Sequence, residues 1–132
     1  MTPEGLIVRA SRHEPKETMD RLAAAVTARG AAVVARVDHA AAAATVGLAL
    51  APTEVLIFGN PKAGTPLMQA AQTIGVDLPL KALVWRDAAG TAHLGYNDPH
   101  WLARRHGAEA GHEADLKAMA ALLAAVAEEA AG

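Results

Sequence analysis

The sequence has no cysteine, few aromatic residues and no excess of positive charge. Without cysteine the chain has no disulfide, thiolate metal site or cysteine nucleophile. Aromatic residues make up only 3% of the chain, with one Phe and one Tyr, so Ala and aliphatic side chains must form most of the core. Lys and Arg total 12 against 14 acidic residues, with no basic run, and nucleic acid is therefore not expected as a partner.

Long apolar runs are also missing. The longest stretch with little charge, residues 40–52, is too short and too rich in Ala and Gly to cross a bilayer. Residues 1–5 lack the basic stretch and apolar segment of a signal peptide. We therefore expect a cytoplasmic chain of 132 residues with no membrane partner and one hydrophobic core.

Short β-branched runs and amphipathic segments predict an α+β domain. Strands are expected at residues 6–8, 33–37, 55–58, 82–85 and 93–96, and helices at 15–29, 40–46, 65–74, 99–106 and from 112 onward. This order lacks the regular alternation of a parallel sheet, so a mainly antiparallel sheet with helices packed on one face is expected. Residues 1–107 would form this domain, and residues 108–132 would add a C-terminal helix packed on it or on a partner subunit.

The segment of residues 58–66 has the densest concentration of turn-forming residues. We expect the apolar strand 55–58, buried on both faces, to end in a turn, with Thr65 and Pro66 opening the next helix. Free amides of Gly64 and Thr65, with the charge of Lys62, could then bind an anion. Gly59 and Gly64 have the spacing of a phosphate-binding loop, but Thr65 replaces its lysine, which disfavours nucleotide hydrolysis. The alternative is a tight strand-to-helix turn without a ligand.

Several motif blocks together resemble the DUF302 family of domains of unknown function. The resemblance extends from about Gly5 to His106, with the tail after Gly107 as an additional or variable segment. It implies a small α+β domain related in shape to the TATA-binding-protein-like fold, often dimeric, and it implies no activity. The blocks that carry it are Val55-Leu56-Ile57-Phe58-Gly59-Asn60-Pro61-Lys62, Gly64-Thr65-Pro66-Leu67-Met68, Asp77-Leu78-Pro79-Leu80-Lys81 and Tyr96-Asn97-Asp98-Pro99.

The histidines do not have the spacing of metal ligands. His100 and His106 are six residues apart, which places them on opposite sides of a helix, and His93 lies on a predicted strand. Surface or capping positions explain them better than a metal site. Asp98 before Pro99 is explained best as the cap of the helix that follows. No metal or other cofactor is expected.

The leading hypothesis is a homodimeric domain that binds a small anionic or amphipathic ligand. The alternatives are a hydrolase or lyase that uses Asp98, His93 or His100 and Tyr96, and an interaction domain. The interaction domain would recruit a partner through the apolar stripe of its C-terminal helix, which comprises Leu116, Met119, Leu123 and Val126. The candidate ligand-binding residues are Phe58, Gly59, Asn60, Lys62, Gly64, Thr65, Trp85, Tyr96 and Asp98.

Overall fold

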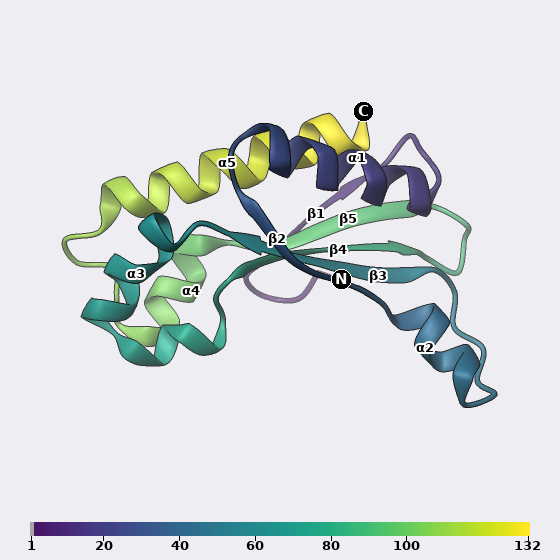
Figure 1. Ribbon diagram of the computed structural model, residues 1–132, viewed down its shortest axis with the longest axis horizontal. Helices are drawn as coiled ribbons and strands as arrows, with labels where there is room; N and C mark the ends of the chain where they lie inside the picture. The colour runs from purple at the N-terminus through teal and green to yellow at the C-terminus, as the bar shows by residue number, and fades with distance from the viewer. Residues whose placement is uncertain (1) are drawn as a thin grey trace.

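A computed structural model describes residues 2–132 and contains a five-stranded, fully antiparallel sheet with the order β1-β5-β4-β3-β2 (Figure 1). The elements, in chain order, are β1 (Leu6–Ala10), α1 (Pro15–Ala28), β2 (Ala32–Asp38), α2 (His39–Thr45), β3 (Thr53–Gly59), α3 (Pro61–Ala70), the 3-10 helix η1 (Gln72–Val76), β4 (Leu80–Arg86), β5 (Ala92–Asn97), α4 (Pro99–His106) and α5 (Glu113–Ala131). The predicted α+β class with an antiparallel sheet and a long C-terminal helix is confirmed.

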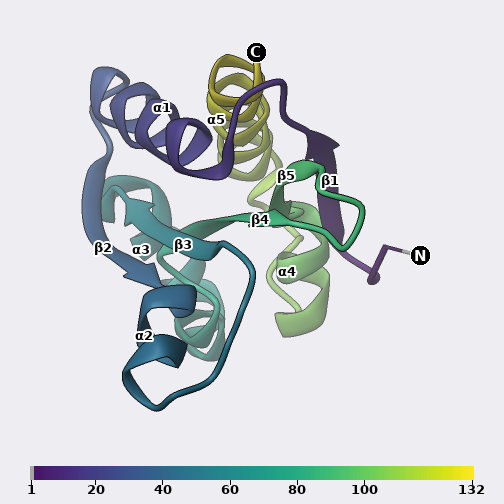
Figure 2. The same ribbon diagram turned by 90° about the vertical axis from the view of Figure 1, so that its right-hand side faces the viewer.

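Helices α1 and α5 lie side by side and cover one face of the sheet (Figures 1 and 2). Both helices have an apolar stripe at three- and four-residue spacing, which is typical of a helix with one buried face. The stripe of α5 is buried within this chain and is therefore not free for the partner recruitment that we gave as an alternative. The buried stripe residues are Met19, Leu22 and Val26 in α1 and Leu116, Met119, Leu123 and Val126 in α5.

The opposite face of the sheet is not covered by α1 or α5. In β3, Leu56 and Phe58 are fully buried, whereas Val55 and Ile57 are partly exposed. Because successive strand residues point to opposite faces, this alternation identifies a strand packed on one side only. The expectation that residues 55–58 are buried on both faces was therefore wrong.

Helix α3 begins at Pro61 with Asn60 as its cap, five residues before the start predicted with Thr65 as the cap and Pro66 as the first helical residue. Asn60 has an extended backbone, and its side-chain oxygen accepts a hydrogen bond from the backbone N–H of Lys62 at 2.9 Å. Pro61 is suited to the first helical position, because the N–H that it lacks has no partner there in any helix. Asn60 and Pro61 thus supply the same capping chemistry that we had assigned to Thr65 and Pro66.

Helix α3 ends at Ala70 and is followed by the separate 3-10 helix η1, so the predicted single helix to residue 74 was also wrong at its end. The boundaries of the remaining predicted helices agree closely with the structure. Asp38 caps α2 through the N–H of Ala41, and Asp98 caps α4 through the N–H of His100, each at 2.9 Å. Gly107 ends α4 with a φ of 68°, the left-handed conformation expected of a C-terminal glycine. Helices α3 and α4 with η1 gather at one end of the sheet, while α2 protrudes at the other (Figure 1).

Candidate functional site

A cavity of about 320 Å³ lies where the start of α3 meets the end of β3 and the start of β4. A smaller hollow of about 190 Å³ shares Gly59, Asn60 and Met119 with it and reaches Arg29 and Asp115. Most of the groups around the cavity of about 320 Å³ are apolar, so the space suits a hydrocarbon better than a strongly hydrated ion. Its lining residues are Ala32, Val34, Gly59, Asn60, Pro61, Ala63, Gly64, Thr65, Met68, Leu78, Pro79, Leu80 and Met119.

The backbone amides at the start of α3 are already occupied. Besides the Lys62 amide held by the Asn60 side chain, the N–H groups of Ala63 and Gly64 donate to the Asn60 carbonyl at 2.9 and 3.1 Å. Thr65 lies in the helix interior instead of at its cap. The anion site expected from free amides of Gly64 and Thr65 is therefore not formed, because the earlier helix start uses the Gly64 amide internally.

The structure brings together only part of the predicted ligand set. Gly59, Asn60, Gly64 and Thr65 line the apolar cavity of about 320 Å³, and Lys62 is exposed on α3 next to them.

The aromatic candidates and Asp98 lie elsewhere. Phe58 and Tyr96 are buried in the core, and Asp98 caps α4. Trp85 pairs with Thr53 at the end of β3 farthest from Gly59. These residues do not surround one space. Tyr96 lies on the face of the sheet that the helices cover, whereas Trp85 lies on the opposite face.

The residues suggested for a hydrolase or lyase also do not converge. His93 Nε2 lies 2.7 Å from an Asp87 carboxylate oxygen, and the imidazole stacks on Trp85. The hydrogen bond with His93 lowers the pKa of the Asp87 carboxyl, and burial raises the pKa of the Tyr96 phenol. Within residues 2–132 no group of three or more His, Asp or Glu side chains is placed to hold a metal ion.

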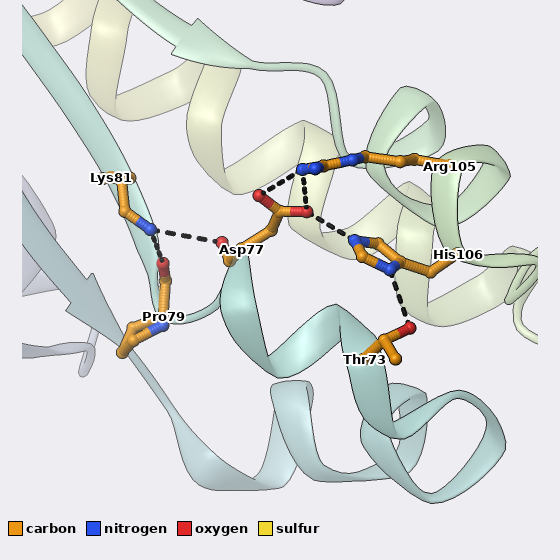
Figure 3. Close-up of polar contacts among 6 residues, drawn as sticks. All are labelled: Thr73, Asp77, Pro79, Lys81, Arg105 and His106. Atoms are coloured by element: carbon orange, nitrogen blue, oxygen red, sulfur yellow. Dashed lines mark hydrogen bonds and ion pairs between the residues drawn. The ribbon is translucent and has the colours of Figure 1, made fainter.

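Asp77 forms a polar cluster that the sequence analysis did not identify (Figure 3). Its carboxylate accepts two hydrogen bonds from Arg105, at 2.9 and 3.0 Å, and lies 2.5 Å from His106 Nε2. The second ring nitrogen of His106, Nδ1, lies 2.9 Å from the hydroxyl oxygen of Thr73. The side chains of His106 and Asp77 are only 8% and 15% exposed, so the cluster joins η1 to α4 at a largely buried contact.

This Asp77 cluster also fixes one wall of the cavity. Lys81 Nζ donates to the backbone carbonyls of Asp77 and Pro79, at 3.4 and 3.2 Å, while Leu78 and Pro79 line the cavity. The order Asp77-Leu78-Pro79-Leu80-Lys81 was visible as a motif. Its contacts were not, because Arg105 and His106 come from a helix 28 and 29 residues further along the chain.

The model of the family described as "Domain of unknown function DUF302" matches residues 7–129. The chain belongs to this family. The match includes α5, so the C-terminal helix is part of the family domain and is not a segment added to it, which was one of the two expectations for this tail. The crystal structure of an uncharacterized conserved DUF302 protein from Bacillus stearothermophilus has a TM-score of 0.84 and 19% identity, and the match covers 97% of this chain and 99% of that one. It shows that the two proteins share the fold.

Relatives with higher identity carry a functional name. The protein named "Fluoride-specific ion channel FluC 1" from Brucella suis biovar 1 is 48% identical over 128 residues, covering 97% of this chain and 50% of the relative. "Fluoride-specific ion channel FluC 2" from Brucella melitensis biotype 1 is also 48% identical, with 47% of its length covered. The chain thus spans about half the length of these relatives. Among residues 2–132 no helix is both long and apolar enough to cross a membrane.

Proposed function

We propose that this DUF302 domain binds a small amphipathic molecule in the cavity between α3, β3 and β4. The observation that carries the proposal is a largely apolar space of about 320 Å³ formed by the two segments that hold the sequence motifs, residues 59–65 and 78–80. Small-molecule sites typically combine apolar walls with a few polar groups that fix the ligand's orientation.

Polar groups are available where the cavity and the smaller hollow share lining residues. Asn60 lines both spaces, and Arg29 and Asp115 border the smaller one. The Arg29 guanidinium is partly occupied, since it bonds the Ala25 carbonyl and Glu129. A ligand with a hydrocarbon body and one polar or charged head would place its body against Met68 and Leu78 and its head near Asn60.

Binding can be tested by calorimetry and thermal unfolding with a series of straight-chain carboxylates and the matching alcohols. We expect affinity to rise with chain length until the cavity is full, by about tenfold for every two methylene groups. Gly64→Leu places a side chain in the cavity and should abolish binding. Ala70→Leu, at an exposed position on the same helix outside the cavity, should retain it. No binding by any member of the series would reject the proposal.

We also propose that the domain forms a homodimer through β2 and the segment after it. Strand β2 is an edge of the sheet, and α2 buries none of its residues. Unpaired edge strands readily pair with a second copy, and a twofold axis would bring two identical apolar surfaces together. Most of the large exposed apolar side chains fall in this segment: Val33, Val34, Val37, Val46, Leu48 and Leu50.

Sedimentation or light scattering of two charge variants tests the dimer. Val34 and Val76 are similarly exposed, at 63% and 72%, but only Val34 lies on β2. Val34→Lys should convert the dimer to a monomer, and Val76→Lys should leave it unchanged. A wild-type chain that is monomeric at every concentration would contradict the proposal.

The relatives named fluoride-specific ion channels favour an accessory role in fluoride transport. We propose that the channel activity belongs to the half of those proteins that this chain does not match, and that the domain acts beside it. The 48% identity confined to one half of the Brucella suis relative supports this division. In liposomes, the full relative should release fluoride and this chain alone should not. Fluoride release by this chain alone would contradict the division.

A further inference from the structure

We propose that Thr73 is a nucleophilic hydroxyl, activated by His106, that accepts an acyl group from activated esters. The proposal is independent of the cavity and rests on the Asp77 cluster (Figure 3). A carboxylate, an imidazole and a hydroxyl are joined in that order, with heavy-atom distances of 2.5 and 2.9 Å. This is the arrangement by which an acid and a base activate an alcohol.

The hydrogen-bonding roles define the tautomer of His106. The ionised Asp77 carboxylate can only accept, so the proton of a neutral imidazole lies on Nε2, which faces that carboxylate. Nδ1 then has a free lone pair and accepts the hydrogen bond of the Thr73 hydroxyl. Nδ1 is thus the base that can remove the Thr73 proton, and Asp77 holds the ring in the required orientation.

Exposure within the cluster also fits an attacking hydroxyl. The His106 side chain is 8% exposed and shielded from bulk water, whereas Thr73 is exposed on η1. An incoming ester can therefore reach the hydroxyl oxygen. Arg105 also donates hydrogen bonds to the Asp77 carboxylate and fixes its orientation. The positive charge of Arg105 reduces the capacity of Asp77 to stabilise a His106 imidazolium. We therefore expect acylation only by esters with good leaving groups.

The reaction balances without a cofactor. The Thr73 oxygen bonds to the ester carbonyl carbon as its proton passes to His106 Nδ1. The bond from that carbon to the leaving aryl oxygen breaks, and the aryl oxide departs with the electron pair. The proton on His106 is then released to solvent. Water can later cleave the Thr73 ester and return the free hydroxyl.

The test is acetylation of the full chain by p-nitrophenyl acetate, followed by peptide mapping with mass spectrometry. Thr91, an exposed threonine in the hairpin loop, serves as the internal control because within residues 2–132 its hydroxyl forms no hydrogen bond with a histidine. We expect Thr73 to be acetylated at least about 100-fold faster than Thr91, the scale of general-base catalysis. Hydroxylamine should remove the label, because esters are cleaved by it and lysine amides are not.

Two substitutions separate nucleophilic chemistry from a structural tie. Thr73→Ser should react faster because its hydroxyl is less hindered, and His106→Gln should slow acetylation of Thr73 by about 100-fold. Circular dichroism shows whether the His106→Gln variant remains folded. If that variant unfolds, the Thr73→Ser variant still tests the proposal. Equal acetylation of Thr73 and Thr91 in the wild-type chain would overturn the proposal and leave the cluster as a link between η1 and α4.

Discussion

Replacing Gly64 by alanine should stabilise the folded chain. Gly64 lies in the interior of α3 with an ordinary negative φ. A Cβ built there would lie 3.6 Å from Leu78 Cδ1 and 3.8 Å from Met68 Cε, which are ordinary van der Waals distances. The new methyl group therefore meets no clash and adds apolar contact at the edge of the cavity.

The expected gain follows from helix propensity. Alanine is favoured over glycine in a helix interior by about 1 kcal/mol, because glycine loses more backbone entropy on folding. For a chain of this length a change of that size raises the midpoint of thermal unfolding by roughly 3–4 °C. Differential scanning calorimetry of the wild-type and Gly64→Ala chains without ligand measures the shift.

Two other glycines provide contrasting controls for this prediction. Gly90 has a φ of 89° with open space around it, so Gly90→Ala should be destabilising by about 1–2 kcal/mol through backbone strain alone. Gly5 has a φ of 79°, and a Cβ there would lie 2.3 Å from Trp101 Cδ2, so Gly5→Ala should cost more. A midpoint for Gly64→Ala at or below that of the wild-type chain would refute the reasoning.

Three further predictions concern the core and the polar cluster. Burial raises the pKa of Tyr96, the only tyrosine, so ultraviolet titration should show its phenol ionising at higher pH in the folded than in the unfolded chain. Stability should correspondingly fall as the pH rises through about 10, where the unfolded phenol loses its proton first. Leu123→Ala should lower the free energy of unfolding in urea by about 2–5 kcal/mol, because Leu123 is 1% exposed between α5 and the sheet. Asp77→Asn should lower it by about 1–3 kcal/mol, because the bonds from Arg105 and His106 lose their charged acceptor.

Sequence reasoning was sufficient where each element depended on neighbouring residues. Asp98 sits directly before its helix, so its cap could be predicted, and Asp38 has the same position before α2. The loop of the β4–β5 hairpin likewise follows from local turn residues. The start of α3 was ambiguous, because Asn60-Pro61 and Thr65-Pro66 are both good cap pairs. Asn60-Pro61, which directly follows β3, forms the cap. The helix therefore starts before Thr65, and the amides that we had expected to be free are bonded within it.

Contacts between distant segments determined the rest of the site. Nothing near Asp77 in the sequence points to Arg105 and His106, and only the return of α4 beside η1 brings them together. The Asp77 segment therefore has two different sides, with Leu78 and Pro79 facing the cavity and the Asp77 carboxylate facing α4. A ligand that displaces Leu78 would strain the bonds of Asp77, and loss of those bonds would loosen the cavity wall. The Asp77→Asn variant should accordingly show weaker binding in the carboxylate and alcohol series that tests the proposed site, although Asp77 itself does not line the cavity.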